Sequence, residues 1–156
     1  MIERIRAIPL RRFEDGRGWF MEICRESWLP QPSRQTNVSF SRAGVIKGLH
    51  YHERGQDDLF VCLSGTARVV ALDRESGETF SLDIGDENPV AVYVPGALAH
   101  GYEALTDVLF CYHASAEYDA DDPDEHEIAW DDLRVKHLWS TQSPILSHRD
   151  AAAASS

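Results

Sequence analysis

The chain of 156 residues is 43% hydrophobic and 26% charged, values that are typical of a globular domain. Fifteen basic and 26 acidic residues give a formal net charge of −11, which argues against nucleic acid or an anionic membrane as the main partner. The sequence contains no apolar run of about 18 residues, so no transmembrane helix is expected, and the charged N-terminal segment is unlike a secretory signal. Three widely spaced cysteines predict free thiols in a cytoplasmic protein.

Short apolar and β-branched runs between turn signals predict strands along most of the chain. The expected strands are Trp19–Cys24, Gln35–Phe40, Val45–His50, Leu59–Ser64, Ala67–Asp73, Thr79–Ile84, Ala91–Val94 and Val108–Ala114. Their spacing favours an antiparallel barrel or sandwich over alternating βαβ units. The helical signal is limited to one short turn at Arg25–Leu29.

Residues 1–150 are expected to form a single domain, followed by a disordered, low-complexity tail at 151–156. The acidic segment Asp121–Glu127 is expected to be an exposed loop. The Val- and Ala-rich segment Arg68–Asp73 suits a strand that is covered on both faces, as in a double-sheet jelly roll. A Pro-Gly turn at Pro95 precedes His100, which is an arrangement that directs a histidine into the mouth of a jelly-roll barrel.

The most informative polar residues are three histidines. His50 and His52 are two residues apart and would share one face of a strand, and His100 follows the Pro-Gly turn. One interpretation is a metal site, in which these histidines and Asp57 or Asp58 bind Fe, Mn, Ni or Zn. The other is metal-free acid–base chemistry, in which a histidine moves a proton, a carboxylate fixes its tautomer and a separate acid acts from the opposite face. The spacing of the residues leaves both interpretations open.

Several short sequence motifs, in the order found in the family, make the chain similar to the dTDP-4-dehydrorhamnose 3,5-epimerase family of sugar-nucleotide epimerases. They are Asp15–Glu22, Gln35–Ser41, Lys47–His52, Val94–Gly101, Phe110–Tyr112, Ile128–Asp132 and Leu146–Asp150, and they extend over nearly the whole chain. The resemblance implies an all-β, cupin-like jelly roll (a double-stranded β-helix) with few short helical turns. It also implies a homodimer, a nucleotide-sugar substrate, and no metal or organic cofactor.

The resemblance further implies roles for individual residues. His50 matches the catalytic base, Asp150 the carboxylate that orients it, and Tyr112 the general acid that returns a proton from the opposite face. The positions matched to substrate binding are Arg17, Phe20, Glu22, Gln35, Asn37, Lys47, Gln56, Asp58, His100 and Tyr118. Arg17 is expected near the phosphates and Glu22 near the nucleotide base, and Lys47 is a second candidate for the diphosphate.

The expected reaction uses the acidity of the C–H bonds at C3 and C5 of a 4-keto sugar. A base on one face removes a proton and produces an enolate, and an acid on the other face returns a proton and inverts the centre. The enzyme must therefore hold a base and an acid across the ring from each other and stabilise the oxyanion between them.

Three positions depart from the family pattern. Lys47 stands where arginine is usual, His52 where glutamine is usual, and Asp58 where a lysine normally helps to stabilise the enolate. An acid at position 58 would oppose negative charge on the sugar oxygen. The expected function is therefore an epimerase acting at C3, C5 or both. A metal-dependent cupin enzyme and a non-catalytic sugar-nucleotide-binding relative are the alternatives.

Overall fold

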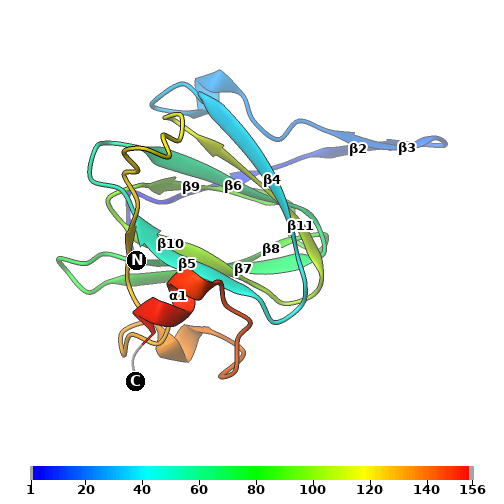
Figure 1. Cartoon of the computed structure of the whole chain (residues 1–156). Helices are drawn as coiled ribbons and strands as arrows, with labels where there is room; N and C mark the ends of the chain where they lie inside the picture. The colour runs from blue at the N-terminus through cyan, green and yellow to red at the C-terminus, as the bar shows by residue number, and fades with distance from the viewer. Residues whose placement is uncertain (1, 155–156) are drawn as a thin grey trace.

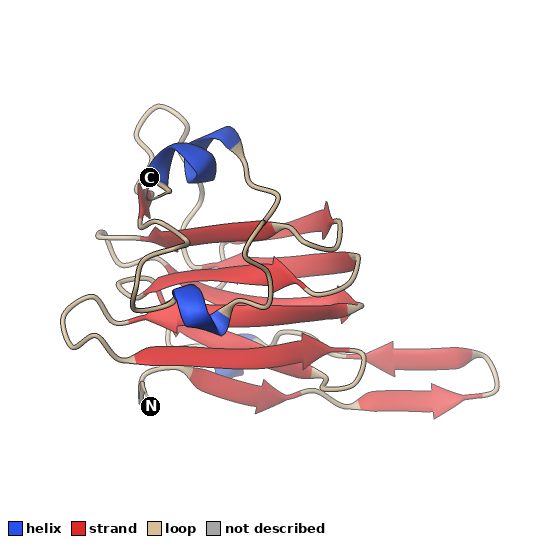
Figure 2. Ribbon diagram, turned by 90° about the horizontal axis from the view of Figure 1, so that it is seen from below, coloured by secondary structure: helices blue, strands red, loops and turns tan. Residues whose placement is uncertain are grey.

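A computed structural model describes residues 2–154 and places two antiparallel five-stranded sheets face to face (Figure 1). The strand order is β1–β9–β6–β11–β4 in the first sheet and β12–β5–β10–β7–β8 in the second. A separate hairpin, β2–β3, extends away from the sheets (Figure 2). The strands are β1 (Arg6–Pro9), β2 (Arg12–Asp15), β3 (Gly18–Met21), β4 (Gln35–Ser41), β5 (Ile46–Tyr51), β6 (Asp57–Ser64), β7 (Thr66–Leu72), β8 (Thr79–Gly85), β9 (Val90–Pro95), β10 (Ala99–Ala104), β11 (Val108–Ala114) and β12 (His126–Glu127).

Helical structure within residues 2–154 is limited to short segments. These are the 3₁₀ turns η1 (Glu26–Trp28) and η2 (Lys136–Leu138) and the helix α1 (His148–Ala153). The turn expected at Arg25–Leu29 is present as η1. None of these helices has the length and apolar character needed to cross a membrane. The expected disordered tail is wrong for residues 151–153, which belong to α1, and residues 155–156 lie outside the described part of the chain.

Three hydrophobic clusters explain how the sheets are buried. The first fills the space between the two sheets and includes Phe60, Val69 and Phe110. The second covers the outer face of the second sheet, where the segment containing Trp130 and Trp139 packs. The third covers the outer face of the first sheet. Strand β7 is consequently buried on both faces, as the Val- and Ala-rich sequence predicts.

Each strand expected from the sequence is present, with shifts of a few residues at the ends, whereas β1, β2, β10 and β12 are additional. Strand β10 lacks a typical strand sequence, because it contains Gly101 and the acidic Glu103. A Cβ atom at position 101 would lie 2.2 Å from the carbonyl oxygen of Lys47, so close contact between β10 and β5 requires glycine there. Glu103 is buried and accepts hydrogen bonds from the backbone N–H and the hydroxyl of Ser140. Local propensity therefore misses β10, which tertiary contacts stabilise.

Candidate active site

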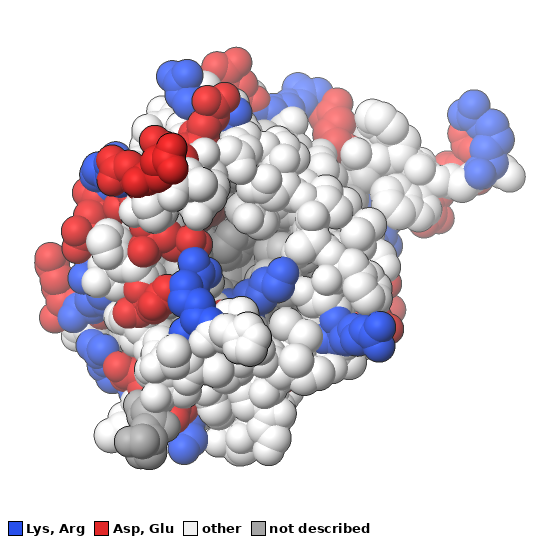
Figure 3. All heavy atoms as spheres, in the orientation of Figure 1, with Lys and Arg blue, Asp and Glu red and all other residues white. Residues whose placement is uncertain are grey.

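A cavity of about 810 Å³ opens between the two sheets. Its walls come from strands β4, β6 and β11 of the first sheet, strands β5 and β10 of the second, the loop 116–125 and helix α1. In Figure 3 the surface is hollowed between the sheets, with basic side chains at one side of the hollow and acidic side chains crowded to the left. The volume lies within the range of pockets that bind small molecules and cofactors.

His50 and Asp150 form a hydrogen-bonded pair at this cavity. His50 Nε2 donates to Asp150 Oδ1 at 2.8 Å, and the backbone N–H of Gly48 donates to Asp150 Oδ2 at 3.1 Å. Burial favours the neutral carboxyl group, but these hydrogen bonds and the nearby charge of Arg149 outweigh it and lower the pKa of Asp150. We assign the Nε2 proton to this bond, because a buried carboxylate requires donors. The lone pair of His50 is then on Nδ1.

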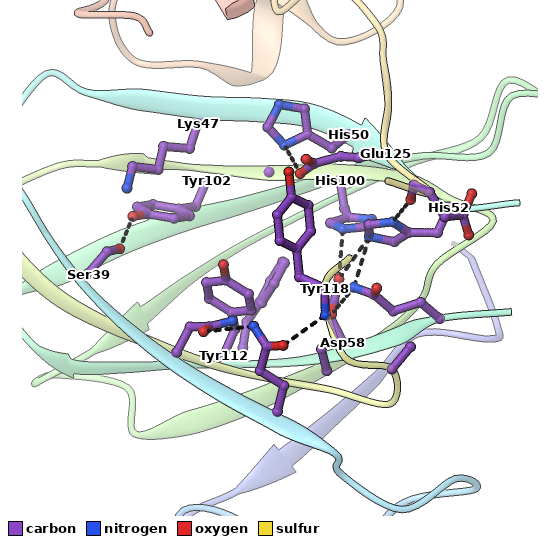
Figure 4. Close-up of a pocket in the computed structure, with 18 of the residues that line it drawn as sticks. Ser39, Lys47, His50, His52, Asp58, His100, Tyr102, Tyr112, Tyr118 and Glu125 are labelled. Atoms are coloured by element: carbon purple, nitrogen blue, oxygen red, sulfur yellow. Dashed lines mark hydrogen bonds and ion pairs between the residues drawn. The ribbon is translucent and has the colours of Figure 1, made fainter. Parts of the chain in front are cut away.

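The Nδ1 atom of His50 faces the cavity. It lies 3.8 Å from Glu125 Oε1, and Figure 4 shows this nitrogen directed toward Glu125. Arg149 Nη2 lies 3.0 Å from the other ring nitrogen, and Arg149 is itself held by Glu125 at 2.7 Å. A carboxylate near Nδ1 stabilises the imidazolium that forms when His50 accepts a proton. This arrangement allows His50 to accept a proton from a ligand in the cavity.

Local backbone geometry places Asp150. The hydroxyl of Ser147 caps α1 by accepting from the N–H of Asp150 at 3.1 Å, which fixes Asp150 in the first turn. Gly48 has φ +121°, and a Cβ atom there would lie 2.8 Å from the carbonyl oxygen of His100. Glycine at position 48 therefore allows its N–H to reach the Asp150 carboxylate.

Tyr112 lies on β11 of the first sheet, whereas His50 lies on β5 of the second, and Figure 4 shows them on opposite sides of the cavity. The Tyr112 ring packs perpendicular to Phe60, with ring centroids 6.3 Å apart. Burial, together with the charges of Asp58 and Glu125, raises the pKa of Tyr112. Tyr112 is therefore protonated at neutral pH and can act as a proton donor.

A second His–Asp arrangement lies in the wall of the same cavity. Asp58 Oδ2 is 3.1 Å from His100 Nε2 and 3.3 Å from His52 Nε2, and all three residues are buried. Burial opposes the ionisation of Asp58, but the hydrogen bonds and charges of His100 and His52 outweigh it and lower its pKa well below the usual range. Gln56 Nε2 donates to the other oxygen, Asp58 Oδ1, at 3.1 Å.

The metal interpretation from the sequence is therefore wrong in part. His50 is directed to Asp150, away from the other two histidines. Asp57 does not line the cavity, because its oxygens accept from Gln31, Gly96 and the Tyr93 hydroxyl. Among the described residues, the group that could hold a metal ion is His52, Asp58 and His100.

Comparisons with known proteins identify relatives of this chain. A sequence model of the dTDP-4-dehydrorhamnose 3,5-epimerase family matches residues 1–156. The chain belongs to the dTDP-4-dehydrorhamnose 3,5-epimerase family. The predicted family, the all-β jelly-roll fold and the isomerase class of the enzyme are thereby confirmed.

A curated relative and two solved structures illustrate the similarity. The chain is 37% identical to the spore coat polysaccharide biosynthesis protein SpsL of Bacillus subtilis over 91% of this chain and 99% of that protein. It is 28% identical, with a TM-score of 0.88, to an epimerase of Legionella pneumophila in complex with dTDP-4-keto-L-rhamnose, over 98% of this chain and 88% of that one. A 3′-monoepimerase of Streptomyces bikiniensis in complex with dTDP-quinovose is 26% identical with a TM-score of 0.85, over 97% and 83% of the two chains.

Within this epimerase family member, most of the residues matched to substrate binding line the cavity. They are Gln35, Asn37, Lys47, Gln56, Asp58, His100 and Tyr118. The Gln35 side chain links two of its neighbours, because it accepts from the Tyr118 N–H at 2.8 Å and donates to Asn37 Oδ1 at 3.1 Å. Lys47 has no carboxylate partner among residues 2–154, so its charge is available to an anionic ligand.

The three matched residues of the hairpin segment are not at the cavity within this chain. Arg17 pairs with Asp15, and Glu22 pairs with Arg25. Phe20 is 63% exposed on β3. The single chain therefore does not bring these three residues to a nucleotide in its own cavity.

The segment Asp121–Glu127, expected to be an exposed loop, is exposed at residues 121–123, but the expectation is wrong for Asp124 and Glu125, which are half-buried at the cavity. Asp124 accepts hydrogen bonds from the backbone N–H groups of Glu53 and Arg54, and its carbonyl oxygen lies 2.6 Å from His52 Nδ1. Glu125 faces His50. These contacts join residues about 70 positions apart, so the acidic composition of the segment gives no signal of them.

Proposed function

We propose that this epimerase inverts C3, C5 or both in a dTDP-linked 4-keto-6-deoxy sugar. The observation that carries the proposal is the His50–Asp150 pair on one wall of the cavity and Tyr112 on the opposite wall. Inversion requires proton removal from one face of the sugar ring and proton return to the other. The ligands named in the solved relatives, dTDP-4-keto-L-rhamnose and dTDP-quinovose, are both dTDP-linked 6-deoxy sugars, and the first of them carries the 4-keto group.

In the proposed reaction, His50 Nδ1 removes the proton next to the sugar carbonyl. The C–H electrons pass into the carbonyl group and form an enolate, while Asp150 and Glu125 stabilise the positive imidazole ring. Tyr112 then gives its hydroxyl proton to the same carbon from the opposite side. Lys47 supplies positive charge for the oxyanion or for the diphosphate.

Hydrogen exchange in deuterated water tests this proposal. The purified protein is mixed with dTDP-4-keto-6-deoxyglucose in D₂O, and NMR follows deuterium at C3 and C5. We expect deuterium at one or both positions and its loss in His50→Ala. The matched control is His137→Ala, which removes an exposed histidine outside the cavity. Binding of the sugar nucleotide without any exchange would support the non-catalytic alternative.

We also propose that the protein is a homodimer in which the β2–β3 hairpin contacts the second copy. Phe13, Trp19 and Phe20 of the hairpin are 48%, 52% and 63% exposed. Strand β4 forms an edge of the first sheet and exposes Val38 and Phe40 as well. An exposed apolar hairpin and an exposed apolar sheet edge are each suited to pairing with another chain. Such pairing could bring Arg17, Phe20 and Glu22 to a cavity of the partner.

Light scattering after gel filtration tests the dimer. We expect the mass of two chains for the wild type and a shift to the mass of one chain for Phe20→Ser combined with Phe40→Ser. The control is Leu133→Ser, because Leu133 is 89% exposed on a different part of the surface. A wild-type mass of one chain, or a variant that remains a dimer, contradicts the proposed interface.

A cytoplasmic location is proposed from the thiols. Cys24, Cys62 and Cys111 are free, and burial raises the pKa of Cys62 to about 11. Free, unreactive thiols are typical of proteins in reducing compartments.

A further inference from the structure

The side chains of His52, Asp58 and His100 converge in a buried cluster that has no role in the proposed epimerase reaction. Its three side chains come from both sheets, because Asp58 lies on β6, His100 on β10 and His52 directly after β5. One ligand atom from each residue lies within 4.8 Å of the other two, and the side chains are only 4–7% exposed. Figure 4 shows the two imidazole rings directed toward Asp58.

The proton positions in this cluster follow from its backbone partners. His52 Nδ1 is 2.6 Å from the carbonyl oxygen of Asp124, and His100 Nδ1 is 2.8 Å from the carbonyl oxygen of Leu98. A carbonyl oxygen only accepts, so each Nδ1 atom carries a proton. In a neutral ring the Nε2 atom then presents a lone pair, and both Nε2 atoms face the same oxygen of Asp58. Three electron-pair donors that converge in a buried place require positive charge between them, which a proton on an imidazole ring or a bound metal ion can supply.

The geometry fits a metal ion as the source of that charge. Bonds of about 2.0–2.1 Å to nitrogen and oxygen place neighbouring ligand atoms of a tetrahedral ion about 3.3 Å apart. The two distances from Asp58 Oδ2 to the histidine nitrogens are 3.3 and 3.1 Å. Histidines that bind metals commonly donate their other ring N–H to a backbone carbonyl, as His52 and His100 do here.

The surroundings hold the ligands in place. The Asp124 carboxylate accepts from the N–H groups of Glu53 and Arg54, which fixes the carbonyl that orients His52. A Cβ atom on Gly96 would lie 1.6 Å from the carbonyl oxygen of Gln56 and 3.1 Å from the His52 ring, so glycine is required where these segments meet. The ligand-bearing segments are therefore positioned before any ion binds.

We propose that His52, Asp58 and His100 bind one divalent first-row transition-metal ion, such as Zn²⁺ or Co²⁺. All three residues also line the cavity, so an open coordination position of the ion faces the space where a ligand binds. Imidazole and carboxylate ligands select this class of metal over Ca²⁺ and Mg²⁺, which prefer oxygen ligands. The proposal concerns a site separate from the His50–Asp150 pair and does not depend on the epimerase activity.

Cobalt binding tests the proposal directly. Untagged protein is stripped with a chelator, dialysed, and titrated with Co²⁺ in excess Mg²⁺, while the visible absorption of the bound ion is recorded. We expect one equivalent of Co²⁺ and displacement of Co²⁺ by Zn²⁺. Azide, added as a probe of the open position, is expected to change the spectrum. An unchanged spectrum with azide would overturn the open position.

Variants assign the ligands. Asp58→Asn and His52→Gln are expected to weaken Co²⁺ binding by about 100-fold or more, whereas the exposed control His137→Gln retains it. Circular dichroism of each stripped variant shows whether the fold is kept. Absence of Co²⁺ absorption in the wild type overturns the proposal whatever the variants do. Unchanged affinity in folded Asp58→Asn and His52→Gln also overturns it. Because no sugar nucleotide is present, the result is independent of the hydrogen-exchange experiment.

Discussion

His50 and His52 lie two residues apart and each faces a buried aspartate, yet their proton chemistry differs. His50 has one nitrogen bonded to Asp150, and its other nitrogen faces the cavity. Both nitrogens of His52 face oxygen atoms, one from the Asp124 carbonyl and one from Asp58. The residue types are the same, but only His50 has a lone pair that a substrate can reach.

The partners of the second nitrogen therefore decide the role of each histidine. Burial disfavours the charged form of His52, but Asp58, the Asp124 carbonyl and the charge of Glu125 outweigh this effect and raise its pKa. A histidine that is held by acceptors on both sides is a poor proton acceptor for a substrate. Its two nitrogens are occupied within the cluster, so it offers no position for a proton from the substrate.

The largest expected effect comes from removing the base. His50→Ala should lower the rate of deuterium incorporation by about 10³-fold, because a positioned general base contributes rate factors of this order. His52 should not compensate, since its ring does not present a free lone pair to the cavity. NMR of the sugar nucleotide in D₂O measures the rate. Rapid exchange in His50→Ala would contradict the claim that His50, and not His52, removes the proton.

Removal of the proposed acid, Tyr112, should separate proton exchange from inversion. In Tyr112→Phe, inversion is expected to fall by about 10²-fold. Deuterium should still enter without inversion, because His50 can remove and return a proton on one face. NMR distinguishes deuterated starting sugar from deuterated product. Equal losses of exchange and inversion would contradict separate faces for base and acid.

A smaller effect is expected when the orienting carboxylate becomes an amide. Asp150→Asn keeps the shape of the side chain but removes the charge that stabilises protonated His50. We expect a loss of about 10- to 100-fold in exchange, because a hydrogen bond to a charged group contributes about 1.5–3 kcal/mol. The KM for the sugar nucleotide should change little, because Asp150 acts through His50. Steady-state kinetics measure both quantities. A change confined to KM would instead indicate a role in binding.

The smallest expected effect is on stability at acid pH. The pKa of Asp150 is lowered in the folded chain, so its charged form contributes stability above the ordinary aspartate pKa of 3.8. This contribution is lost as the pH falls through the folded-state pKa. The melting temperature of the wild type should therefore fall more steeply from about pH 5 downward than that of Asp150→Asn. If the melting temperatures of the two proteins fall in parallel with pH, ionisation of Asp150 does not contribute to stability.

The sequence predicts the strands of the sandwich well, because apolar and β-branched runs mark most of them. It also predicts His50, Asp150 and Tyr112 together, through the resemblance to the family. It does not predict how His50 and His52 differ, because that depends on Asp124, Glu125 and Asp150, which lie 72 to 100 positions away along the chain. Long-range contacts of this kind leave no local pattern.

The substitution of Asp58 illustrates the same limit. From sequence, an acid at this position opposes an enolate. In the structure, both of its oxygens are engaged, one by Gln56 and the other by His52 and His100. Its charge is therefore balanced within the cluster. Only the three-dimensional contacts show that Asp58 is held by three polar neighbours and is not a free charge facing the cavity.

The ring stack of Tyr102 and Phe110 has a consequence for the size of the substrate. Tyr102 belongs to β10 and Phe110 to β11, so their rings, with centroids 3.8 Å apart, connect the two sheets at the wall of the cavity. His50 and Tyr112 are attached to these same two layers. The stack therefore acts as a spacer, and a change of ring size within the core would alter the gap between proton acceptor and proton donor. A different ring at either position would therefore change both the wall of the cavity and the separation of the two groups proposed to move protons.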